Sequence, residues 1–122
     1  MFRIGIIGSD NSHADAFSKL LNVGIHPDDS QAKLIAGNAV LRDETGNLFP
    51  FPEYKVTALY GTDPERNRQV CEVGKIPLLV DSPEEMMDKV DGVMVVWRHG
   101  DLHMKYAMPF IQAGMPVWID KP

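Results

Sequence analysis

The stretch GSDNSH, residues 8–13, places residues able to do chemistry directly behind a buried apolar run near the start of the chain. A glycine such as Gly8 after a strand opens the dinucleotide-binding pattern G-x-G-x-x-G. Asp10 and His13 stand where the second and third glycines of that pattern would be. A helix that begins directly afterwards offers free N–H groups and a partial positive charge to a phosphate. The stretch therefore predicts an altered phosphate-binding turn, with contacts from Gly8, Ser9, Asp10, Asn11, Ser12 and His13.

The acidic residue of this turn needs a partner, because Asp10 brings a negative charge to the place where a pyrophosphate comes closest. We expect Asp10 and His13 to pair with each other. The alternative interpretation is that Asp10 and Asn11 only cap the helix, and that His13 is an ordinary polar residue of its first turn.

Ribose recognition is expected at the end of the second apolar strand, residues 55–60. An acidic residue at this point selects NAD by accepting hydrogen bonds from the ribose hydroxyls. Gly61 stands in that place, and Thr62 and Asp63 follow as candidate cofactor contacts. Asp63 serves equally well as the N-cap of the next helix. The choice between NAD and NADP is therefore not readable from these residues.

A further group of polar residues, WRHGDLH, follows the strand expected at residues 92–97. Ligands of open α/β sheets bind at the carboxyl ends of the strands, so this group predicts cofactor or substrate contacts from Trp97, Arg98, His99 and His103. The spacing of four between His99 and His103 is also found in zinc sites, but a site requires more ligands and the sequence shows no third one in a suitable motif. We expect no metal site.

The chain ends in Asp120-Lys121-Pro122, directly after a short apolar strand. A lysine at the carboxyl end of a strand can donate to a substrate hydroxyl or carbonyl oxygen, and it assists proton transfer if desolvation lowers its pKa. Lys121 is the predicted catalytic residue, with Asp120 as a neighbouring cofactor contact. The alternative is an ordinary solvated lysine.

Short apolar runs and helical segments alternate along the rest of the chain, and this alternation must position the candidate residues. Helices are predicted at 12–23, from Pro64 to Gly74, after Ser82, and at 101–113; strands are predicted at 2–7, 55–60, 78–80, 92–97 and 117–119. Strands that alternate with helices and read as continuous apolar runs indicate an α/β fold, a parallel sheet covered on both faces.

Residues 24–54 interrupt the alternation with a stretch rich in Gly, Pro, Asp and Asn. The stretch is far longer than the ~2–6 residues that usually connect a helix to the next strand. We predict an insertion before strand two that is dispensable for the core. Its middle favours either a hairpin around Thr45-Gly46-Asn47 or an extra helical turn.

Composition excludes several classes of protein. A chain of 122 residues with 44% apolar residues supplies one domain. A net charge of −5 without a Lys/Arg cluster argues against nucleic acid as a partner. No apolar run approaches the ~20 residues of a membrane span or the core of a signal peptide, so we expect a cytoplasmic protein that does not interact with membranes. The single cysteine, Cys71, excludes an internal disulfide and is expected to be structural.

Four features taken in order resemble one family: a first strand that ends in Gly8, then TDPER, WRHGDLH and VWIDKP. Together they resemble the N-terminal nucleotide-binding domain of the Gfo/Idh/MocA (glucose–fructose oxidoreductase / inositol 2-dehydrogenase) family. In that family the fourth strand leads into a Thr-Pro-Asn-x-x-His-like segment and the fifth ends in Glu-Lys-Pro. The resemblance implies a Rossmann-like domain over residues 1–122, doubly wound in three layers with strand order 3-2-1-4-5, that binds NAD or NADP. It also implies a C-terminal substrate domain that is absent from this chain.

The function implied by the resemblance is that of the nucleotide-binding domain of an NAD(P)-dependent oxidoreductase acting on a sugar- or polyol-like hydroxyl/carbonyl substrate, with Lys121 near the nicotinamide. We expect the chain by itself to bind a dinucleotide without turnover and to be able to form a homo-oligomer. Two alternatives are open. A non-catalytic Rossmann-like binding or oligomerisation module that has lost the dinucleotide is favoured by Asp10, His13 and Gly61, and a binder of another nucleotide is the third possibility.

Overall fold

The computed structural model describes residues 1–22 and 53–120. The strands are β1 (Phe2–Ile7), β2 (Tyr54–Tyr60), β3 (Leu78–Leu79), β4 (Gly92–Val95) and β5 (Val117–Ile119). The helices are α1 (Ser12–Asn22), α3 (Pro64–Gly74) and α4 (Asp101–Gln112), with a 3₁₀ turn η1 (Pro83–Met86). The hairpin expected in the insertion and the predicted catalytic Lys121 lie outside the described residues. No helix in the two described ranges is long and apolar enough to cross a membrane.

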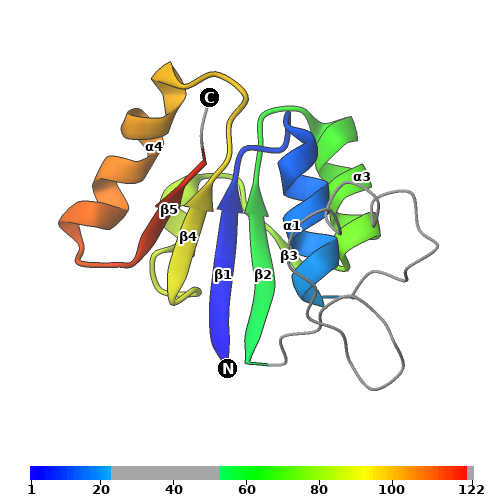
Figure 1. The fold of residues 1–122 in the computed structure, drawn as a ribbon, viewed down its shortest axis with the longest axis horizontal. Helices are drawn as coiled ribbons and strands as arrows, with labels where there is room; N and C mark the ends of the chain where they lie inside the picture. The colour runs from blue at the N-terminus through cyan, green and yellow to red at the C-terminus, as the bar shows by residue number, and fades with distance from the viewer. Residues whose placement is uncertain (23–52, 121–122) are drawn as a thin grey trace, which may run out of the picture.

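The five strands form one parallel sheet in the order β3-β2-β1-β4-β5, which confirms the predicted order (Figure 1). The register between β1 and β2 shifts once, because Ile4 pairs with Val56 and Gly5 pairs with Ala58. From β1 the chain continues to β2 and β3 on one side of the sheet, and then to β4 and β5 on the other side of β1. The carboxyl ends of β1 and β4 therefore make the point where open α/β sheets bind their ligands.

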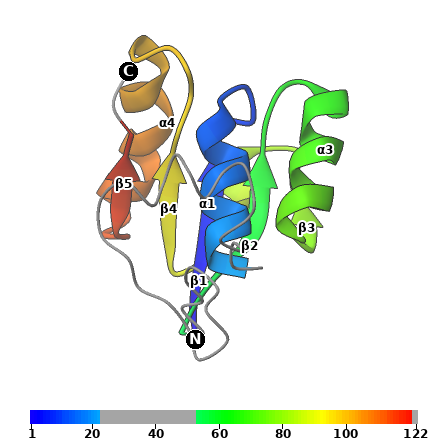
Figure 2. The same ribbon diagram turned by 45° about the vertical axis from the view of Figure 1, so that its right-hand side comes forward.

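Helices α1 and α3 cover one face of the sheet, and α4 with η1 covers the other (Figure 2). The core beneath α1 and α3 is built from Ile4, Ile6, Ala14, Val56, Leu59, Val70, Ile76 and Val96. The core beneath α4 includes Ile7, Ala58, Val80, Met86, Val90, Val93, Val95, Trp97, Ala107 and Phe110. Burial of β1 and β4 on both faces explains why these strands read as unbroken apolar runs.

Helix α3 begins and ends at the residues that its sequence predicts, Pro64 and Gly74, but Gly74 is not the residue that takes the left-handed conformation. The Asp63 carboxylate accepts hydrogen bonds from the backbone N–H groups of Glu65 and Arg66, at 3.0 and 3.4 Å. At the other end, Lys75 and not a glycine takes the left-handed conformation, with φ 53°. Gly74 is the last helical residue, and a Cβ there would lie 2.2 Å from the hydroxyl oxygen of Ser18. This glycine therefore allows α1 and α3 to approach each other closely.

The full helix predicted after Ser82 is wrong, because the structure has only the 3₁₀ turn η1 there. Ser82 makes no side-chain capping hydrogen bond, and the Glu85 carboxylate accepts from the backbone of Asp81 at 3.2 Å. Met86 and Val90, four residues apart, are both buried against the sheet. Packing of these two side chains takes precedence over the local capping signal.

Cys71 is half-buried against the core beneath α1 and α3. Burial raises the pKa of its thiol, as for a structural cysteine.

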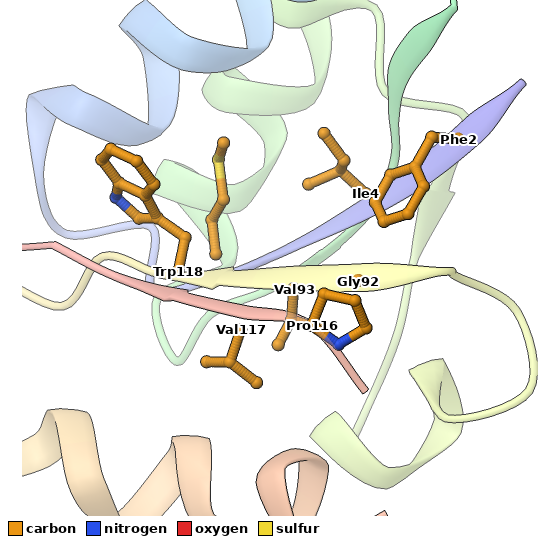
Figure 3. A pocket seen from close by; sticks show the side chains of 8 residues that line it. Phe2, Ile4, Gly92, Val93, Pro116, Val117 and Trp118 are labelled. Atoms are coloured by element: carbon orange, nitrogen blue, oxygen red, sulfur yellow. The ribbon is translucent and has the colours of Figure 1, made fainter. Parts of the chain in front are cut away.

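An apolar groove of about 190 Å³ lies beside β5 and reaches to the amino ends of β1 and β4 (Figure 3). Trp118, Ile4 and Phe2 rise from one face of the sheet, whereas Val117 and Val93 point to the other (Figure 3). The Trp118 side chain is 55% exposed on this groove. The groove contains few polar atoms, and it is separate from the polar residues at the carboxyl ends of the strands.

Candidate functional site

All strands are parallel, so the loops that follow them gather at one edge of the sheet, the carboxyl edge (Figure 1). This edge contains the turn from β1 to α1, the loop from β2 to α3, the loop from β4 to α4, and the end of β5. Every predicted site residue that the structure describes lies in these segments or in the first turn of the helix that follows. The predicted site residues therefore share one edge of the sheet, and their partners come from the tertiary structure.

The turn after β1 requires its glycine. Gly8 has a φ of +112°, and a Cβ at this position would lie 2.7 Å from the backbone nitrogen of Trp97. The Gly8 N–H donates to the carbonyl oxygen of Tyr60 at 2.8 Å. The turn is thereby held against both the β2 end and the loop that follows β4.

The predicted pair between Asp10 and His13 is wrong, since each residue has a different partner. The Asp10 carboxylate accepts a hydrogen bond from the backbone N–H of Arg98 at 3.1 Å. The Nδ1 atom of His13 bonds to the Asp120 carboxylate, which is buried at the end of β5. The reason is placement: Asp10 lies before the helix beside the β4 loop, whereas His13 in the first turn of α1 reaches β5. Asp120 therefore links α1 to β5.

The start of α1 keeps open hydrogen-bond donors. The Asn11 side-chain oxygen accepts from the backbone N–H of His13 at 3.1 Å, and its carbonyl oxygen accepts from Ala14 at 3.0 Å. Within the described ranges, the backbone N–H groups of Asn11 and Ser12 have no acceptor, and Ser12 is exposed. Open N–H groups and the partial positive charge of a helix start form a favourable place for an anion.

At the end of β2, packing excludes the acidic residue that usually contacts the ribose. A Cβ on Gly61 would lie 2.0 Å from the hydroxyl oxygen of Ser9 and 2.2 Å from the side-chain oxygen of Asn67. Ser9, Gly61 and Asn67 thus interlock where the β1 turn meets the β2 loop. Any larger residue at position 61 would separate the two loops.

Asn67 is one of the residues at this edge that sequence reasoning missed. Its Nδ2 donates to the carbonyl oxygen of Gly61 at 2.9 Å, but its Oδ1 is buried without a hydrogen-bond partner among the described residues. The residue is 5% exposed. The available signal was its position on the buried face of α3, three and seven residues before Val70 and Gly74.

A pocket of about 400 Å³ opens beside Asn67, between the ends of β2 and β3. It is lined by Tyr60, Gly61, Thr62, Pro64, Asn67, Leu79, Val80 and Asp81. Thr62 is exposed at its margin, and Asp63 beside it uses its carboxylate to cap α3. The pocket is lined by both apolar and polar side chains, and the Asn67 side chain with its unpaired oxygen belongs to its wall. A few polar groups in a partly apolar hollow are typical of small-molecule sites.

An ion pair joins this pocket region to the turn between β1 and α1. The Arg66 guanidinium donates to both carboxylate oxygens of Asp15, at 2.8 and 3.1 Å, and more weakly to the carbonyl oxygen of Asn11, at 3.4 Å. Arg66 and Asp15 are each only about one-fifth exposed. Both residues belong to first turns of helices that start at the same edge, and that shared position was the signal for the pair.

The loop after β4 divides into a buried and an exposed part. Trp97 is 3% exposed and packs against Tyr60 and Tyr106, with ring centroids 6.3 and 5.1 Å away. Burial, with Tyr106 nearby, raises the pKa of Tyr60. The buried His103 bonds through Nε2 to the carbonyl oxygen of Trp97 at 2.7 Å, so α4 holds the start of this loop. Arg98 and His99 are exposed and remain available to a ligand.

The described residues contain no group of His, Cys, Asp or Glu able to hold a metal ion.

Comparison with known proteins finds a matching family model. The chain matches the model of the GFO_IDH_MocA family, an oxidoreductase family with an NAD-binding Rossmann fold, over residues 2–122. No curated protein matches the sequence.

Several solved structures share the fold. A probable dehydrogenase from Thermotoga maritima is 18% identical, with a TM-score of 0.63, over 99% of this chain and 28% of its own. The apo scyllo-inositol dehydrogenase of Lactobacillus casei is 15% identical, with a TM-score of 0.67, over 100% and 29%. The myo-inositol dehydrogenase of Lactobacillus casei, in complex with NAD(H) and myo-inositol, is 16% identical, with a TM-score of 0.65, over 100% and 29%. This chain therefore spans less than a third of the length of these structural neighbours.

Proposed function

Since the chain belongs to the GFO_IDH_MocA oxidoreductase family and has its NAD-binding Rossmann fold, we propose that it is the dinucleotide-binding domain of an oxidoreductase that acts on a sugar- or polyol-like substrate. The observation that carries the proposal is one continuous edge: the open donors of Asn11 and Ser12 lie beside the interlocked loops that lead to the Asn67 pocket. A neighbour with this fold is recorded in complex with NAD(H) and myo-inositol.

The residues of this edge fit a dinucleotide. The pyrophosphate would be held by the backbone N–H groups of Asn11 and Ser12, where the helix start favours negative charge. Asp10 keeps its negative charge in this arrangement, but its carboxylate is held by the Arg98 N–H of the β4 loop and not by the N–H groups of the helix start. The adenosine half would be held in the pocket beside Asn67, whose unused Oδ1 can accept a hydrogen bond from an amino or hydroxyl group. When bound, the dinucleotide supplies or accepts the hydride.

Lys121 is proposed as the residue that transfers the proton to or from the substrate oxygen. It directly follows Asp120, which is anchored twice: its side chain bonds to His13, and its N–H donates to the carbonyl oxygen of Val95 at 3.0 Å. A residue that moves a proton must be held within hydrogen-bond reach of the reacting oxygen. The anchored Asp120 supports this requirement. A second domain, outside this chain, is proposed to complete the substrate pocket.

One observation favours the second candidate, a non-catalytic module that has lost the dinucleotide. The Asp10 carboxylate on the Arg98 N–H joins the β1 turn to the β4 loop across the switch point. A ligand that needs this crevice opened would have to break that hydrogen bond or bind beside it.

Titration calorimetry of NADH, NADPH, ATP and coenzyme A into the purified chain tests the proposal. We expect binding of a nicotinamide dinucleotide, weakened roughly tenfold by Ser12→Asp, because the new charge repels the phosphate at the helix start. Gln69→Asp is the matched control, since it adds the same charge on the exposed side of α3. Absence of dinucleotide binding by the folded protein would favour the non-catalytic module.

A further inference from the structure

Proteins tell NAD from NADP by how they treat one group, the 2′-phosphate of the adenosine ribose. An acidic residue at the end of the second strand rejects the phosphate, and a nearby arginine accepts it. Here Gly61 occupies the acidic position, and its neighbours Ser9 and Asn67 leave no room for a side chain. Any discrimination by this chain must therefore come from other residues.

Among the residues that the structure describes, Arg66 is the positively charged side chain placed to meet a 2′-phosphate. It belongs to the first turn of α3, directly after the pocket-lining residues Thr62 and Pro64. Its guanidinium reaches across to the carbonyl oxygen of Asn11 in the turn between β1 and α1. The guanidinium thus spans the space between the proposed pyrophosphate site and the adenosine pocket.

The guanidinium is already neutralised by a carboxylate. Asp15 accepts two parallel hydrogen bonds from Arg66, at 2.8 and 3.1 Å, which is the strongest geometry available to such a pair. Both side chains are mostly shielded from water, so the attraction is screened less than on an open surface. Breaking this pair to bind a phosphate would leave a partly buried carboxylate without its counter-ion.

The pocket offers no other counter-charge to a phosphate. The side chains that line it include no Lys or Arg, and the ionised one is Asp81. Glu85 lies close by, because its carboxylate accepts the Asp81 N–H at 3.2 Å. A doubly charged phosphate at this mouth would be repelled, whereas ribose hydroxyls can donate to carboxylates.

From these contacts we propose that the chain discriminates for NAD(H) against NADP(H), and that Asp15 is the positioning residue that enforces the choice by holding Arg66. The inference rests on dinucleotide binding at this edge. In this arrangement an ion pair between the starts of α1 and α3 takes the place of the usual acidic residue at the end of the second strand. A single side chain on α1 therefore sets the specificity.

The first test needs no variant. The dissociation constants of NADH and NADPH for the unmodified chain are compared by calorimetry, and we expect NADH to bind at least about tenfold more tightly, the effect of one charge-assisted contact. Equal binding of the two would overturn this inference while leaving the proposed function intact. Binding of neither would overturn both.

Asp15→Asn then releases Arg66 while keeping the shape of the side chain. We expect the NADPH-to-NADH ratio of dissociation constants to fall about tenfold. The double variant Asp15→Asn with Arg66→Met should lose this gain, and Asp15→Glu should keep the discrimination of the unmodified chain. A general loosening of the fold would weaken both ligands together, so the ratio separates positioning from stability.

Glu72→Gln is the matched control. It removes one partner of Arg68, an arginine that pairs on the exposed side of the same helix with Glu65 and Glu72. The ratio should not change. Circular dichroism and thermal melting establish that each variant is folded. If the double variant binds NADPH as tightly as Asp15→Asn alone, the freed arginine is not responsible and the proposal is wrong.

Discussion

The two edges of the sheet use the same amide side chain in opposite ways. At the amino edge, Asn22 donates to the carbonyl oxygens of Val56 and Gly74 and accepts from the Val56 N–H, each at 2.8 Å. At the carboxyl edge, Asn67 donates once, to Gly61, and its buried oxygen has no described partner. The Asn22 side chain therefore uses both its donor group and its acceptor within the fold, whereas the side-chain oxygen of Asn67 is left without a described partner.

Ionised groups have partners at both edges, and the kinds of partner differ. At the amino edge, Arg3 holds Asp91 by its guanidinium at 3.1 Å and by its backbone N–H at 2.7 Å, which joins the starts of β1 and β4. At the carboxyl edge, Asp10 and Asp120 are held by a backbone amide and by an imidazole. Fully satisfied polar groups stabilise a fold, and groups left with open capacity mark the place where a ligand can add contacts.

The largest effect is expected for Gly8→Ala at the carboxyl edge. The change places a Cβ 2.7 Å from the Trp97 backbone at a φ of +112°, and we expect a loss of about 4 kcal/mol in the free energy of unfolding. Urea denaturation measures it. Gly114→Ala is the control, because φ is +77° there but nothing lies within 4 Å, so only about 1 kcal/mol of backbone strain is expected. Equal losses would mean that the contact with Trp97 does not matter.

Asn22→Ala tests the saturated asparagine. It leaves one N–H and two carbonyl oxygens without partners, and we expect a loss of about 3 kcal/mol in unfolding free energy. Dinucleotide affinity, measured by calorimetry on the folded fraction, should be preserved since the residue lies at the other edge. A loss below about 1 kcal/mol would show that water replaces these hydrogen bonds.

Asn67→Leu tests the unsaturated one. The substitution removes an unpaired buried oxygen and costs one hydrogen bond to Gly61, so the free energy of unfolding should change by no more than about 1 kcal/mol. Affinity for NADH should fall by about tenfold, because the reserved acceptor is gone. The comparison of the two edges fails if Asn67→Leu destabilises the protein as much as Asn22→Ala does.

The smallest effect concerns Asp91. Hydrogen bonds from Arg3, together with the positive charge of its guanidinium, hold the pKa of Asp91 below the ordinary value of 3.8. A carboxyl whose pKa is lowered by folding stabilises the protein fully above its unfolded pKa, and this contribution is lost as the pH falls through the folded pKa. Acid titration of the unfolding midpoint should therefore be shallower below about pH 4 in Asp91→Asn than in the unmodified chain. Identical acid profiles would show that the pair contributes nothing, as many exposed pairs do.

The alternation of strands and helices could be read from the sequence because its signals are local. Apolar runs define the strands, the Asp63 cap and Pro64 define the start of α3, and Gly114 ends α4 with a φ of +77°. Each of these signals acts within a few residues along the chain. The strand order came from the family resemblance, and the observed sheet agrees with it.

The partners of the site residues could not be read from the sequence. His13 meets Asp120 across 107 residues, Asp10 meets the Arg98 backbone across 88, and Arg66 meets Asp15 across 51. Local pattern predicted instead a pair between Asp10 and His13, three positions apart, because nearby residues were the available partners. The place of each polar residue directly after a strand was enough to predict that it reaches the carboxyl edge. Which of them touch depends on how closely helices and loops pack, and that closeness rests on glycines such as Gly8 and Gly61, where a single Cβ would separate the loops.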